Sequence, residues 1–125
     1  MWEVYNVSQG VFLAQKTFLA NTFLSRLVGL LNRKALAPGE GLLIKPCQAV
    51  HTCFMRFAID VIFLDQDYRV VGLVENIKPF RFSPFFNQGV MALELPAGTV
   101  KETDTQLGNC LDIRGNNSTN SLFIN

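Results

Sequence analysis

The run of four apolar residues between Asp60 and Asp65 constrains the fold of this 125-residue chain more than any other feature. Residues 61–64 read Val-Ile-Phe-Leu, so a strand here would turn apolar side chains to both of its faces. Such a strand has to be covered on both sides. The run is also far shorter than the roughly 18 apolar residues that a membrane-spanning helix needs. We therefore expect a central strand inside a compact domain.

Short strand patterns separated by turn residues surround this central strand. Two form a hairpin over residues 4–15 around Ser8-Gln9-Gly10, and four more are expected at 42–44, 69–75, 90–95 and 110–114. Strands and helices do not alternate along the chain, which argues against a doubly wound fold. The sequence predicts a mainly β (α+β) fold, a small curved or closed barrel-like sheet of about seven short strands with two short helices.

The two helices are predicted from different signals. Residues 22–33 place apolar side chains at helical spacing on one stripe: Phe23, Leu24, Leu27, Leu30 and Leu31. The second helix begins at Thr99, where Thr99 and Glu102 match a capping box, and ends near Gly108.

Composition limits the function classes. Apolar residues make up 49% of the chain and charged residues only 17%, with a net charge of +1. This composition argues against a disordered chain and gives no support for a protein that binds duplex nucleic acid. We expect one globular domain over residues 1–114 and a flexible tail over 115–125. Three cysteines and the lack of a signal pattern predict a cytoplasmic protein with reduced thiols. The expected partner is a small molecule or a protein, not nucleic acid or a membrane, and the expected state is a monomer or weak homodimer.

The segment around His51, the only histidine, is the first candidate site. Cys47, His51 and Cys53 would share one face of a strand and suggest a soft metal site. Six strand residues span roughly 20 Å, however, which is too far for ligands of a single ion. We therefore predict no metal and no cofactor, with the thiols packed as small apolar groups.

Asp60 lies inside an apolar stretch, where a carboxylate must be paired or hydrogen-bonded. It would either bind backbone amides at the rim of the sheet or orient His51 as a partner carboxylate. Arg26 lies opposite the leucine stripe of the first predicted helix and would pair with a buried carboxylate or bind an anion. The residues that would form one ligand pocket are Arg26, His51, Thr52, Met55, Asp60 and Glu94.

Residues 78–86 form an aromatic loop that contains two prolines and four phenylalanines: Phe80, Phe82, Phe85 and Phe86. Exposed rings of this kind would mark an interaction surface. The alternative is a loop that folds over the core, and we expect about half of the rings to be buried in this way.

At these motifs the chain resembles the bacterial and archaeal family called domain of unknown function 192, over about residues 20–114. The resemblance rests on Ser25-Arg26-Leu27-Val28-Gly29-Leu30-Leu31, on Glu40-Gly41-Leu42-Leu43-Ile44, on His51-Thr52 with Met55, on residues 59–65, and on Leu93-Glu94-Leu95-Pro96-Ala97-Gly98. It implies one small β-rich domain and supplies no reaction. The chain departs from the family pattern at Leu42, at Tyr68 after Asp67 and at Asn109 after Gly108.

Three functions remain open from sequence. The first is a small-molecule or carbohydrate-type binding domain with a polar pocket around His51 and Asp60. The second is a hydrolase-like enzyme with His51 as general base, so catalysis is left undecided. The third is an interaction or accessory module that uses the aromatic loop.

Overall fold

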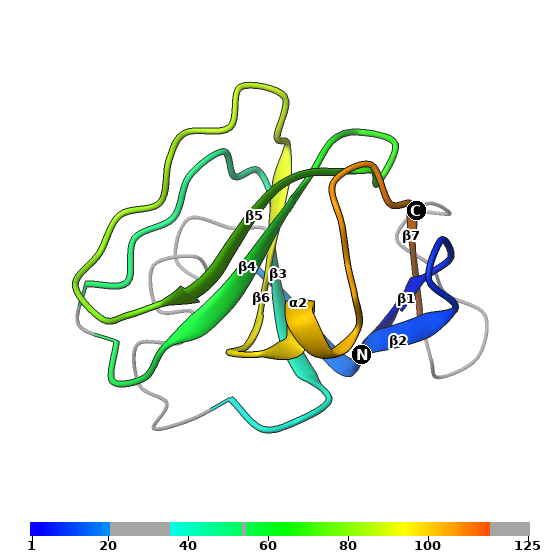
Figure 1. Ribbon diagram of the computed structural model, residues 1–125, viewed down its shortest axis with the longest axis horizontal. Coiled ribbons are helices and arrows are strands. Elements are labelled where there is room, and N and C mark those ends of the chain that lie inside the picture. Colours follow the sequence, from blue (N-terminus) through cyan, green and yellow to red (C-terminus); the bar gives the residue numbers. More distant parts are fainter. Residues whose placement is uncertain (21–35, 54, 116–125) are drawn as a thin grey trace.

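The computed structural model describes residues 1–20, 36–53 and 55–115, and Figure 1 shows their arrangement. Seven strands form one sheet in the order β5-β4-β6-β3-β2-β1-β7. The strands are β1 (Trp2–Asn6), β2 (Val11–Ala20), β3 (Glu40–Ile44), β4 (Ile59–Leu64), β5 (Val70–Ile77), β6 (Met91–Pro96) and β7 (Leu111–Gly115). One short helix, α2 (Thr99–Glu102), follows β6. The predicted mainly β fold is confirmed.

The sheet curls into a half-barrel. Neighbouring strands are antiparallel except β2 and β3, which run parallel. The edge strands β5 and β7 approach each other at one end. There the Leu111 amide donates to the Tyr68 carbonyl, and the Val70 amide donates to the Asn109 carbonyl. These bonds satisfy edge groups that would otherwise be open to pairing with another chain.

Strand β4 is buried along its whole length, as its apolar sequence predicts. Ile62 and Leu64 belong to one hydrophobic cluster, inside the curl of the sheet, together with residues of β1, β3, β6 and β7. Val61 and Phe63 belong to a second cluster on the opposite face. Alternation along the strand therefore gives one sheet two apolar faces that both need cover.

Two loops contribute to the cover of the second face: residues 45–58, of which 54 is not described, and residues 78–90. We call them the loop pair. They run side by side in Figure 1, in teal and yellow-green. Backbone bonds join them, from Ser83 N to Val50 O and from Phe86 N to Gln48 O, both shorter than 3 Å. Val50 and Phe86 pack into the second cluster, so the loop pair has an inner, apolar side.

Several sequence predictions need comment. The helix predicted over residues 22–33 lies outside the described residues, as does the tail beyond Gly115. The capping box at Thr99 and Glu102 is wrong, because Gly98 is the N-cap and the Thr99 hydroxyl donates to the Pro96 carbonyl at 2.7 Å. The helix also ends at Glu102 rather than near Gly108. No helix among the described residues is long and apolar enough to cross a membrane.

Candidate functional site

Asp60 is completely buried and binds backbone amides through both carboxylate oxygens. Oδ1 accepts the Asn76 amide at 2.8 Å, and Oδ2 accepts the amides of Gly98 and Val100 at 3.1 and 2.9 Å. The carboxylate thus connects the start of β4 to the end of β5 and to the turn that begins α2. Its Oδ2 atom binds two amides at the start of the helix, Gly98 N and Val100 N, where a local capping box was expected. Of the two roles predicted for Asp60, its contacts match the binding of amides at the sheet rim.

His51 is exposed on the loop pair, away from the carboxylate of Asp60. Its Nδ1 accepts the Cys53 amide at 3.3 Å, and its ring centroid lies 6.0 Å from that of Phe82. No ion pair or hydrogen bond joins His51 to a carboxylate anywhere in residues 1–20, 36–53 and 55–115. The structure therefore does not bring His51 and Asp60 together as base and orienting carboxylate.

Thr52, next to His51, is the polar anchor of the loop pair and is fully buried. Its hydroxyl donates to the Lys78 carbonyl at 2.6 Å and accepts the Arg81 amide at 2.9 Å. Its backbone adds two bonds to the second loop, from Thr52 N to Arg81 O and from Phe80 N to Thr52 O. One threonine therefore satisfies and fixes the backbone over residues 78–81.

Three of the four phenylalanines of the aromatic loop are exposed. Phe80, Phe82 and Phe85 have 59%, 77% and 65% of their surface open to solvent. Phe86 instead stacks on Phe63 with ring centroids 4.4 Å apart. Gly72 on β5 allows this approach, because a Cβ atom there would lie 2.4 Å from the Phe86 ring. One of the four rings thus packs against the core, whereas about half were expected to be buried. The other three rings are exposed.

Phe80 has a positive φ of 62°, which bulky side chains rarely adopt. Holding a non-glycine residue in this region costs on the order of 1–3 kcal/mol. The strain falls on a residue whose ring is more than half exposed. Unfavourable backbone geometry under an exposed apolar ring is the kind of local conflict that is found at functional surfaces.

Glu94 and Met55 lie in or beside the second cluster. Glu94 is 5% exposed and is paired across the sheet with Leu42 on β3 and Val61 on β4. Burial raises the pKa of Glu94 to about 7. No hydrogen bond to its carboxylate comes from the described residues. Met55 is buried in the same cluster as Leu42 and Val61, whereas Arg26 lies outside the described residues.

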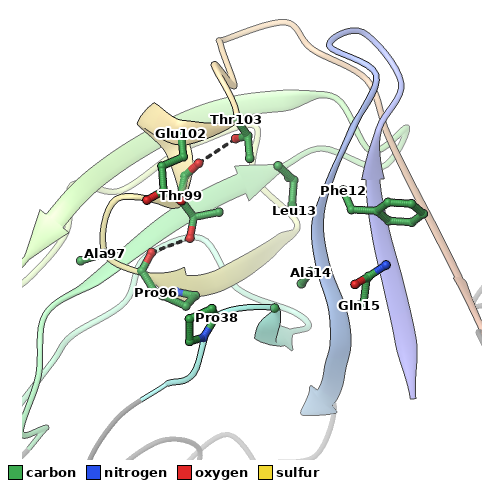
Figure 2. Close-up of a pocket in the computed structure, with 11 residues that line it drawn as sticks. Phe12, Leu13, Ala14, Gln15, Pro38, Pro96, Ala97, Thr99, Glu102 and Thr103 are labelled. Carbon is green, nitrogen blue, oxygen red and sulfur yellow. Dashed lines mark hydrogen bonds between the residues drawn. The ribbon is translucent and has the colours of Figure 1, made fainter.

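A cavity of about 270 Å³ lies elsewhere, between β2, the turn at Pro38 and Gly39, and the segment from Pro96 to Thr103. Figure 2 shows the hydroxyls of Thr99 and Thr103 turned to the carbonyls of Pro96 and Thr99, with donor–acceptor distances of 2.7 Å in both cases. None of the predicted site residues lines this cavity. Nothing in the sequence pointed to this cavity beyond two turn motifs, and the hydroxyls of Thr99 and Thr103 already donate to carbonyls.

No cluster of three or more His, Cys, Asp or Glu side chains able to hold a metal occurs among the described residues. Cys47 and Cys53 lie on the loop pair rather than on a strand, and both are partly exposed and form no disulfide. The expected extended face through residues 47–55 is wrong, because among the described residues of this range only His51 forms a β-bridge, with Phe82.

Solved structures with the same fold exist. A protein of unknown function from Novosphingobium aromaticivorans superposes with a TM-score of 0.76 at 21% identity, covering 89% of this chain and 82% of that one. A Sinorhizobium meliloti protein, described as a candidate transcription regulator, gives 0.73 at 24% identity, covering 89% and 90%. At these identities the likeness shows the fold alone.

Sequence comparison places the chain in a family. A UPF0127 protein of Pyrococcus furiosus is 33% identical over 113 residues, covering 86% of this chain and 94% of that protein. A UPF0127 protein of Pyrococcus abyssi is 31% identical with the same coverage. The profile of the DUF192 family, described as an uncharacterized ACR, matches residues 5–113. The chain therefore belongs to the DUF192 family, whose function is not established.

Proposed function

We propose that this protein is an interaction module that binds a macromolecular surface through the outer side of the loop pair. The observation that carries the proposal is the exposure of Phe80, Phe82 and Phe85 on a loop that is bonded to its neighbour through Thr52 and through the amides of Ser83 and Phe86. Exposed apolar patches on monomeric proteins commonly mark contact sites. A pre-ordered loop also loses less conformational entropy on binding than a mobile one.

The other two candidate functions receive less support from the geometry. A polar pocket around His51 and Asp60 would need both side chains in one cavity, but Asp60 is buried against three amides and His51 is exposed. A hydrolase with His51 as general base would need a carboxylate bonded to its ring, and within the described residues the bond to His51 comes from the Cys53 amide instead. The cavity beside α2 is slightly smaller than the roughly 300–1,000 Å³ typical of ligand pockets.

Site-directed photo-crosslinking in the producing cells tests the proposal. p-Benzoylphenylalanine replaces Phe82 in one variant and Leu107 in a control, because Leu107 is 64% exposed but lies outside the loop pair. We expect covalent capture of protein, lipid or nucleic acid at position 82 well above capture at position 107. Equal capture at the two positions would overturn the interaction role.

A further inference from the structure

We propose that the surface bound by the loop pair is that of a lipid bilayer carrying anionic headgroups. This inference rests on the interaction role proposed above and names the partner. It departs from the expectation of no membrane contact, which came from the overall charge balance and the lack of a spanning segment. Neither property describes how charge is distributed over the folded surface.

The loop pair is a basic part of the chain. It contains Lys45, Arg56, Lys78 and Arg81, four of the eleven basic residues, and none of the ten acidic ones. The other seven basic and ten acidic residues leave the rest of the chain at a net charge of −3. All four cations are exposed. The near-neutral sequence therefore folds with a local charge of +4 on the loops that carry the exposed rings.

Acidic residues next to the loop pair in the chain do little to cancel this charge. Asp60 follows the first loop, but it is fully buried and bound by backbone amides. Glu94 follows the second loop and is 5% exposed. Glu75, three residues before Lys78, is the one exposed carboxylate among the three. The outer side of the loop pair thus keeps a positive excess.

Apolar rings next to exposed cations match the chemistry of the bilayer interface. Phenylalanine rings bury apolar area at the boundary between headgroups and acyl chains, while Lys and Arg are attracted to anionic headgroups. Phe82 and Phe85 are the two most exposed large apolar side chains that the structure describes. Arg81 lies between Phe80 and Phe82, so both kinds of contact come from one short segment.

Three polar side chains of the loop pair, those of Ser83, Gln48 and Thr52, already form hydrogen bonds within it, which leaves fewer groups for a partner recognised by directional bonds. The Ser83 hydroxyl accepts the Val50 amide and donates to the Pro84 carbonyl, both at 2.9 Å. The Gln48 side-chain amide donates to the Asn87 carbonyl at 3.1 Å. The Thr52 hydroxyl is bonded to the Lys78 carbonyl and the Arg81 amide. Recognition of nucleic-acid bases or of a specific protein surface uses free side-chain donors and acceptors. Binding to a bilayer needs only exposed apolar rings and positive charge.

Vesicle co-sedimentation of the full chain tests the inference. The probes are vesicles of phosphatidylcholine alone and vesicles with one third phosphatidylglycerol. Two double variants remove one contact type each, Phe82→Ser with Phe85→Ser, and Lys78→Glu with Arg81→Glu. Their controls are Leu107→Ser and Lys101→Glu, exposed residues of the same kinds outside the loop pair. Circular dichroism and urea midpoints establish that every variant is folded.

We expect the wild-type chain and both controls to bind anionic vesicles more strongly than neutral ones, and less strongly as salt is raised. Charge reversal should lower the partition coefficient by roughly 30-fold or more, and loss of the two rings by at least roughly tenfold. A variant that does not fold is replaced by Phe82→Ser or Lys78→Glu alone, with the same readout.

Two results would overturn the lipid assignment. One is no binding to anionic vesicles, and the other is binding that the loop variants leave unchanged. In either case, capture of a protein or of nucleic acid at position 82 in the crosslinking experiment would leave the interaction role standing with another partner. Absence of selective capture there as well would remove both proposals.

Discussion

The hydroxyl of Thr52 donates to the carbonyl of Lys78 at 2.6 Å, joining residues 26 apart in the chain. The same oxygen accepts the Arg81 amide, so one buried group holds both ends of the segment that carries Phe80. Together with the backbone bonds of Thr52, this contact holds residues 78–81 of the loop pair in place.

Thr52→Val should destabilise the fold by about 1–3 kcal/mol, because it removes two hydrogen bonds of a fully buried hydroxyl, to the Lys78 carbonyl and from the Arg81 amide. Thr52→Ser should restore most of the loss. Hydrogen exchange of the amides over residues 78–83 together with urea unfolding measures both effects. The control Thr99→Val removes only the bond to Pro96 and should leave exchange over these residues unchanged. Unaltered exchange in Thr52→Val would contradict the anchoring role.

Asp60→Ala should cost at least about 3 kcal/mol of unfolding free energy, since three amides lose a charged acceptor in a buried site. Asp112→Ala is the control, because Asp112 pairs with Arg114 at the surface and such pairs contribute about 1 kcal/mol or less. His51→Ala should change stability by no more than about 0.5 kcal/mol, as its side chain is exposed. Urea unfolding of the three variants measures the loss of unfolding free energy, which should be greatest for Asp60→Ala. A loss in Asp60→Ala no larger than in the other two would contradict the structural role of this carboxylate.

Glu94 should make the protein less stable as pH rises. Burial raises its pKa in the folded state to about 7 from its ordinary value of 4.5, so the folded state holds this proton more tightly than the unfolded chain. Its contribution is greatest below pH 4.5 and is lost between pH 4.5 and 7, by an amount on the order of 3 kcal/mol. Unfolding free energies at pH 5 and pH 8 should differ less in Glu94→Gln. Equal pH dependence in the two proteins would show that another group is responsible.

Phe80→Asn should raise the unfolding free energy by about 0.5–1 kcal/mol. Asparagine adopts positive φ more readily than phenylalanine, and the ring that the substitution removes is 59% exposed. Capture by a crosslinker at position 82 should fall in the same variant. Thermal unfolding measures the first effect, and a drop in melting temperature would mean that the ring contributes to the fold rather than to binding.

Most of the fold could be predicted from local patterns. The apolar run at residues 61–64 indicates the buried strand, and turn residues such as Gly10 separate the other strands. The capping box at Thr99 failed because Gly98 is the N-cap, and its carbonyl accepts the Glu102 amide that the Thr99 hydroxyl was expected to bind. The bond from the Val100 amide to Asp60, 40 residues away, is one that a local motif cannot reveal.

The candidate site was only partly predictable. The sequence singled out His51, Thr52 and Asp60, yet it grouped them by proximity in the chain, whereas the fold turns Asp60 to the helix start and Thr52 to the second loop. The aromatic loop was recognised from four phenylalanines, but only the tertiary packing against Gly72 and Phe63 decides that Phe86 alone turns inward. The charge segregation was hidden because a net charge of +1 averages over both loops and the rest of the chain.

Fluorescence of a single tryptophan at position 82 tests the central claim most directly. In a Trp2→Phe background, Phe82→Trp should emit at long wavelength in buffer, and its emission should shift to shorter wavelength when vesicles with one third phosphatidylglycerol are added. Leu107→Trp in the same background should emit at the same wavelength with and without vesicles. A spectrum at position 82 that anionic vesicles leave unchanged would contradict the account.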